Sequence, residues 1–205
     1  MAQSFAWGVL AASPLVIGAI LALRVRFELQ TIGLIMGFGA GALISAVAFD
    51  LVDEAVHKSS GHGATLAGLF IGCGAFFGGD WAIDRMGGSK RKSPRGAEDG
   101  DDALGIVLGS VLDGIPESIV VGLTIYESGA VGGAYLAALL MSNLPEAISS
   151  TVGLVAAGWR RRTILAMWSL IVAVSGVASL AGYVAFQHAP DDVVAFVLTF
   201  AAGAT

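Results

Sequence analysis

The stretch DGIPE, at residues 113–117, lies inside a run of apolar residues long enough to cross a lipid bilayer. A second stretch, SNLPE at residues 142–146, has the same arrangement, with a carboxylate directly after a proline. A charge at membrane depth costs about 2.5–3.5 kcal/mol or more, so it usually faces a cavity, a partner or a substrate. A proline inside a helix also frees the backbone carbonyl one turn back, which can then point at a cation. Together these features predict a cation path.

The composition of the chain predicts an integral membrane protein. Of its 205 residues, 56% are hydrophobic and 13% are charged. Soluble domains carry about 25% charged residues, so this chain is far more apolar than they are. We therefore expect membrane lipid around the protein, and we expect no nucleic acid partner.

Apolar runs of about 20 residues, the length that one crossing requires, recur along the chain. They predict six full spans and the start of a seventh: 5–23, 31–52, 64–83, 103–125, 131–157, 163–186 and from 193 onward. A polar segment at about 85–102 separates the third span from the fourth and has the composition of a flexible loop. The expected fold is an all-α, polytopic transmembrane helix bundle that forms a single domain over residues 1–205.

The distribution of lysine and arginine predicts the orientation of the chain. The loops after the first, third and fifth spans hold ten of these residues, whereas the opposite side holds Lys58 alone. Positive residues gather on the cytoplasmic side of membrane proteins. We therefore expect a multi-pass protein of the cell (inner) membrane, with its N-terminus outside and the 85–102 loop in the cytoplasm.

Short segments of the chain recur in inverted orientation. The sequence IPESI at 115–119 is similar to LPEAI at 144–148, and the expected topology makes these two spans antiparallel. GFGAGA at 37–42 is similar to TFAAGA at 199–204, again on spans of opposite direction. Inverted repeats with interrupted helices at their interface are typical of transporters.

The polar residues of the two Pro-Glu motifs predict a divalent metal site. Asp113 and Glu117 are four residues apart and share a helix face, and Ser142, Asn143 and Glu146 do the same on the next span. Asp113 lies roughly 15 Å into its span, near the middle of the bilayer. Oxygen ligands suit Mg, Ca or Mn, whereas zinc usually also takes His or Cys. Alternatively, the two glutamates hold helices together through hydrogen bonds.

Three further acidic residues lie near the outer end of the second span. Asp50, Asp53 and Glu54 recur at spacings of three and four, which places them on one side of a helix. They predict an acidic entrance that concentrates cations, with Asp50 as its principal member. The alternative is ordinary solvated charge at a helix end.

The paired Pro-Glu motifs resemble those of the ZIP family of metal transporters, whose fourth and fifth spans carry related motifs. Residues 39–50 also resemble the second span of that family. By this resemblance Glu117 and Glu146 match the metal-bridging glutamates, and Asp113 stands where a histidine is usual. Ser142 and Asn143 occupy the polar pair of the fifth span. No histidine remains in either motif, so we expect a harder site than a usual zinc site.

The resemblance implies transport of a divalent metal cation across the cell membrane, zinc or a related ion such as Fe, Mn or Cd. The metal would be the substrate, no organic cofactor is expected, and the protein would form a homodimer. The family has eight spans, so we expect the natural protein to continue for roughly 40 or more residues, enough for the missing helix length.

Two other functions compete with transport. One is a membrane metal sensor or assembly protein that does not transport. The other is an intramembrane aspartyl enzyme that uses Asp50 or Asp80 with Asp113. The enzyme is disfavoured because Asp113 lies centrally in its span, whereas the other two aspartates lie near span ends. We therefore expect that the protein is not an enzyme.

Overall fold

Long helices form from the apolar runs of the sequence. The computed structural model describes residues 1–85 and 100–204, and within those ranges it contains helices and no strands. The helices are α1 (Ala2–Arg24), α2 (Leu29–Ala46), the π-helical segment η1 (Val47–Val52), α3 (Asp53–Lys58), α4 (His62–Arg85), α5 (Gly100–Ser128), α6 (Gly133–Ala156), α7 (Arg161–Ala185) and α8 (Asp191–Gly203). The all-α class is confirmed. Most of the predicted 85–102 loop lies outside the described residues.

Five helical stretches within the described residues are long and apolar enough to cross a membrane. They are Ala2–Arg24, Gln30–Lys58, Gly63–Ala82, Val107–Ser128 and Arg161–Ala185. The predicted span 131–157 forms α6, which has 24 residues. Its polar side chains, among them Asn143 and Glu146, lower its hydropathy, so its crossing stays a prediction. The protein is membrane-embedded, and the predicted number of spans remains to be tested.

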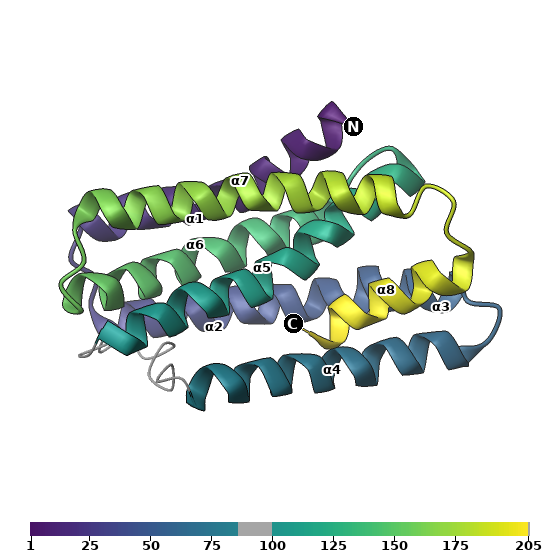
Figure 1. The fold of residues 1–205 in the computed structure, drawn as a ribbon, viewed down its shortest axis with the longest axis horizontal. Helices are drawn as coiled ribbons and strands as arrows, with labels where there is room; N and C mark the ends of the chain where they lie inside the picture. The colour runs from purple at the N-terminus through teal and green to yellow at the C-terminus, as the bar shows by residue number, and fades with distance from the viewer. Residues whose placement is uncertain (86–99, 205) are drawn as a thin grey trace.

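The long helices run along a common axis in alternating directions (Figure 1). The N-terminus and the α3–α4, α5–α6 and α7–α8 connections lie at one end, which holds Lys58 and is named the Lys58 end below. The α1–α2 and α6–α7 connections lie at the opposite end, named the arginine end because arginines 24, 26 and 160–162 belong to it. Their separation from Lys58 agrees with the predicted topology. Which end faces the cytoplasm stays a prediction.

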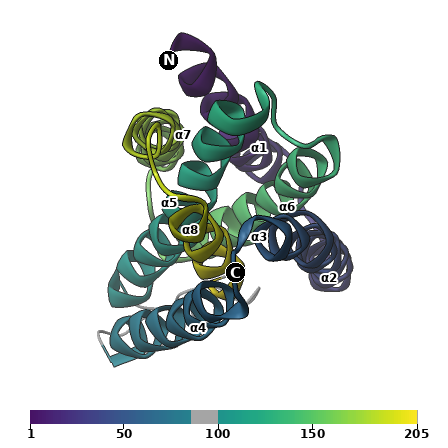
Figure 2. The ribbon, with the colours of Figure 1, turned by 90° about the vertical axis from the view of Figure 1, so that its right-hand side faces the viewer.

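The helices form two groups that meet along α2 and α6. Helices α1, α5, α6 and α7 pack into one bundle, whereas α8 packs against α4, α3 and η1. Figure 2, viewed from the Lys58 end, shows α8 beside α4, with α7 and α1 on either side of the near part of α5. The residues of both Pro-Glu motifs therefore lie in one bundle.

Glycines allow very close approach where α5 meets α7. At Gly122 a Cβ atom would collide with the carbonyl group of Ser179, and at Gly182 it would collide with the carbonyl of Ile119. Small residues of this kind let helix backbones touch in a membrane, where the hydrophobic effect does not drive helix association. The backbones of α5 and α7 are thus in direct contact near the Lys58 end.

Two buried apolar clusters fill the interior, one toward each end. The first includes Val121 on α5 and Leu139 on α6, and the second includes Leu154 on α6 and Trp168 on α7. On α6 the change from one cluster to the other falls at the level of Asn143. The polar residues of the two motifs therefore lie between two apolar cores, near the middle of the bundle.

Candidate functional site

Both motif prolines lie inside continuous helices, Pro116 in α5 and Pro145 in α6. Pro145 leaves the Met141 carbonyl without its helical donor. That carbonyl faces α2, because a Cβ atom on Gly39 would lie 2.7 Å from its oxygen. This carbonyl thus lies in the close packing of α2 on α6. The expectation that a freed carbonyl points at a cation stays a prediction.

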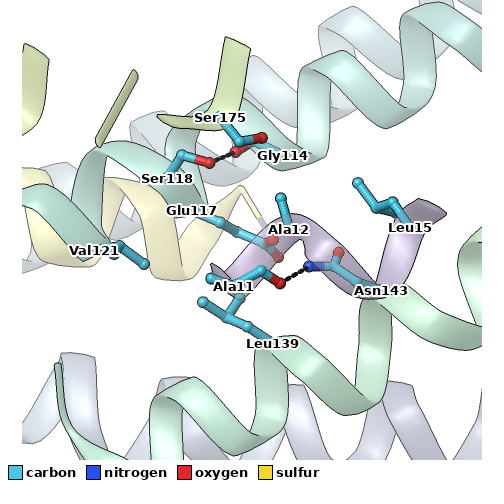
Figure 3. A pocket seen from close by; sticks show the side chains of 10 residues that line it. All are labelled: Ala11, Ala12, Leu15, Gly114, Glu117, Ser118, Val121, Leu139, Asn143 and Ser175. Carbon is cyan, nitrogen blue, oxygen red and sulfur yellow. Dashed lines mark hydrogen bonds between the residues drawn. The ribbon is translucent and has the colours of Figure 1, made fainter. Parts of the chain in front are cut away.

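Glu117 and Asn143 lie at one small cavity among α1, α5, α6 and α7, named the central cavity (Figure 3). Its volume is about 10 Å³, which is roughly the room for one water molecule. Glu117 is 9% exposed and Asn143 is 8% exposed. The Glu117 carboxylate points toward the Asn143 amide, whose Nδ2 donates a hydrogen bond to the Ala11 carbonyl at 3.0 Å.

Glu146 and Asp113 lie close enough to Glu117 for their charges to act on it, Glu146 more strongly than Asp113. Glu146 also accepts a hydrogen bond from the Ser110 hydroxyl, with 2.7 Å between Oγ and Oε1. This bond ties α6 to α5 and is the kind of link that the hydrogen-bonding alternative predicts. The Ser142 hydroxyl donates to the Leu139 carbonyl at 3.2 Å.

The predicted metal ligands thus come together in part. Glu117 and Asn143 share the central cavity, and the charges of Glu146 and Asp113 reach it. Among the residues that the structure describes, no three His, Cys, Asp or Glu side chains are arranged to hold a metal ion. A cation needs oxygen atoms at about 2.0–2.6 Å. The full ligand set therefore stays a prediction.

The three acidic residues of the predicted entrance line one cavity at the Lys58 end. This acidic cavity has a volume of about 510 Å³, and its walls include Asp50, Asp53, Glu54, Thr124 and Tyr135. Asp50 belongs to the π-helical segment η1. Such segments are rare and often mark functional sites. The sequence expectation of a regular helix over 31–52 did not include this segment.

Along α6 the linings of the acidic cavity and of the central cavity are one helical turn apart. Tyr135 lines the first cavity, whereas Val121 and Leu139 line the second. All three are at most 2% exposed. Tyr135 is also within electrostatic reach of both Glu117 and Asp50. Tyr135 was not predicted as a site residue, and its only sequence signal is a phenol at the start of an otherwise apolar span.

An ion pair lies at the rim of the acidic cavity. Lys58 Nζ is 2.7 Å from Glu127 Oε2, which joins α3 to α5. Glu54, which lines the cavity, interacts with both of these residues. Glu127 was missed in the sequence because it stands at a span end, where solvated acids are common. The signal that could have found it is the position of Lys58 and Glu127 at span ends that the predicted topology places on the same side of the membrane.

The arrangement can attract and hold cations, with an acidic cavity at one end and buried carboxylates near the middle. A scan of protein-family models finds no match to the chain, and a search of curated proteins finds none either. The resemblance to ZIP transporters therefore rests on the motifs themselves.

Proposed function

We propose that this protein moves a divalent metal cation across the cell membrane, with Glu117 and Asn143 at the centre of its path. The observation that carries the proposal is the position of these two residues at one buried cavity, with the charges of Glu146 and Asp113 in reach. Burying several carboxylates near one another is costly unless a cation or a proton accompanies them. A transported cation supplies that compensation.

The acidic cavity is the proposed point of entry. Asp50, Asp53 and Glu54 give it a negative potential that raises the local concentration of cations. From there the ion would pass Tyr135, Val121 and Leu139 to reach the central cavity. Because that cavity has room for about one water molecule, we infer that the proposed path must open further before an ion passes.

The donor chemistry favours a relatively hard divalent ion. Carboxylate and amide oxygens suit Mn²⁺ and similar ions, and neither motif contains a histidine or a cysteine. We therefore propose Mn²⁺ or Fe²⁺ as substrates beside Zn²⁺ and Cd²⁺, with the metal as cargo and no organic cofactor.

The division into two helix groups is compatible with a transport cycle in which one group moves past the other. The site belongs to the bundle of α1, α5, α6 and α7, and α2 packs along α6 at the boundary with the other group. In the proposed cycle the bundle moves relative to α2, α4 and α8. The proposal includes a homodimer in the inner membrane with the arginine end in the cytoplasm.

Metal uptake into liposomes that contain the purified protein tests this proposal. We expect saturable uptake of Mn²⁺, and a reduction of at least about tenfold in Glu117→Gln, which loses the central charge but keeps its shape. Glu28→Gln is the matched control, because its acid stands directly before α2, is exposed and makes no capping hydrogen bond. Absence of uptake by the unaltered protein would contradict transport.

A metal sensor that binds without transporting is the second candidate. The Ser110–Glu146 hydrogen bond favours it, because it holds α5 and α6 together beside the site. Saturable metal binding to protein that shows no uptake would support the sensor and exclude the transporter.

A further inference from the structure

Among the residues that the structure describes, Lys58 is the single lysine or arginine at its end of the bundle. It stands at the C-terminal end of α3, one turn beyond Glu54. Its ammonium group forms the ion pair with Glu127, and the two side chains are only 27% and 14% exposed. An ion pair shielded in this way is stronger than one in open solvent. The ammonium group of Lys58 is therefore held in place beside Glu127.

The ion pair adjoins the acidic cavity. Glu54 lines the cavity, as does Ser128, the neighbour of Glu127 in the chain. Glu54 interacts with Glu127 and with Lys58, so one ammonium group lies beside two carboxylates. A soluble cation that enters the cavity meets Glu54 directly, and Glu54 interacts with the paired groups of Glu127 and Lys58.

The pair also joins the two helix groups. Lys58 belongs to α3, which packs with α8 and η1, and Glu127 belongs to α5, which packs with α7 and α1. Breaking the pair removes one polar link between these groups at the mouth of the cavity.

We propose that Lys58 is a tethered counter-cation that competes with the incoming metal ion for Glu54 and Glu127, and so sets the affinity of the acidic cavity. When a divalent ion displaces the ammonium group, the link between α3 and α5 is released. This inference rests on the proposed function, because it assigns Lys58 a role at the entrance of the proposed path.

Charge variants of the full-length chain test the inference with Mn²⁺ as the probe. Binding is followed by the EPR signal of free Mn²⁺, and uptake is measured in liposomes. In Lys58→Met we expect the dissociation constant and the half-saturating concentration to fall about five- to tenfold. That is the effect of removing one positive charge about 7 Å from a divalent ion in water. Lys58→Arg keeps the charge and should match the unaltered protein.

Glu127→Gln should have the opposite effect, since it leaves the ammonium group uncompensated and weakens Mn²⁺ binding by a similar factor. The double variant Lys58→Met/Glu127→Gln has the same net charge as the unaltered protein, so its affinity should return to the original value. The titrations are repeated in variants that also carry Glu117→Gln. This substitution removes the charge of Glu117 from the central cavity, so the affinity that is still measured belongs to the acidic cavity.

Three results would overturn the inference. They are an unchanged dissociation constant in Lys58→Met, equal affinities in Lys58→Met and the double variant, or a loss of thermal stability alone. If Lys58→Met does not fold, the other two variants test the inference. It then requires weaker Mn²⁺ binding by Glu127→Gln and the original affinity in the double variant. Affinity shifts without uptake by any protein would refute transport and support the charge competition. Uptake without affinity shifts would refute the competition alone.

Discussion

Asn143 on α6 donates a hydrogen bond from Nδ2 to the carbonyl of Ala11 on α1, at 3.0 Å. The bond fixes the orientation of the amide at the central cavity, so its nitrogen is engaged with α1 and its oxygen is left for another partner. An amide oxygen is a ligand for hard divalent ions. One side chain thereby connects the packing of α1 on α6 with the proposed binding of the substrate.

We expect Asn143→Ala to reduce Mn²⁺ uptake at least about tenfold and to lower stability by about 1 kcal/mol, the usual value of one hydrogen bond. Liposome uptake and thermal unfolding in detergent measure the two effects. Ser150→Ala, a buried position on the same helix, is the control and should keep its uptake. Full uptake by Asn143→Ala would remove this residue from the path.

Asp113→His should move the metal preference toward zinc. Imidazole is a softer ligand than carboxylate and is favoured by Zn²⁺. Competition between Zn²⁺ and Mn²⁺ during uptake measures the preference, and Asp192→His serves as a control at an exposed position. If the ranking of metals is the same in both variants, Asp113 is not a ligand.

Tyr135→Ala should open a connection between the acidic cavity and the central cavity, because the buried ring lines the first cavity one helical turn from Leu139, which lines the second. We expect a leak of small cations from loaded liposomes, which Tyr135→Phe should not show. Removing a buried aromatic ring also costs about 3–5 kcal/mol of stability. A folded Tyr135→Ala variant that shows no cation leak would indicate that Val121 and Leu139 close the path without the tyrosine ring.

The contact between the α3–α4 and α7–α8 connections should depend on pH through Asp192. Its carboxylate accepts hydrogen bonds from the backbone N–H of Ser60 at 3.0 Å and from the Ser60 hydroxyl. These bonds lower the pKa of Asp192 below its usual value of 3.8, the backbone bond most strongly. The stabilisation is therefore present above pH 3.8 and is lost as the pH falls through the lowered pKa.

The melting temperature of Asp192→Asn tests this dependence. We expect it to lie below that of the unaltered protein near neutral pH, and the difference to shrink as the carboxyl becomes protonated. A difference that stays constant down to about pH 2 would exclude the carboxylate as its cause, since the unfolded chain takes up the proton below pH 3.8 and the stabilisation must already be falling there.

The lengths of the helices could be predicted from the sequence because apolar length decides where a chain can cross a membrane. The predicted span 163–186 corresponds closely to α7 at Arg161–Ala185. The convergence of Asp50, Asp53 and Glu54 on one cavity also followed from their spacing. The π-helical segment around Asp50 could not be predicted, because side-chain periodicity does not determine the hydrogen-bond register of a short segment.

The features that could not be predicted from the sequence depend on contacts between distant parts of the chain. The Met141 carbonyl faces Gly39, a residue about a hundred positions earlier, and no local pattern shows that α2 covers it. Glu127 gains its role from Lys58 on another helix, and Tyr135 gains its place from the two cavities around it. These relationships depend on how the helices pack rather than on how each one forms.

The backbone contact of α5 with α7 also restricts how this sequence can evolve. Gly122 and Gly182 each lie against a carbonyl of the opposite helix, so even a methyl group at either position forces the helices apart. A compensating change in a neighbouring side chain cannot restore the fit, because the obstacle is main chain. Functional descendants of this protein should therefore keep glycine at both positions while the lipid-facing residues around them change freely.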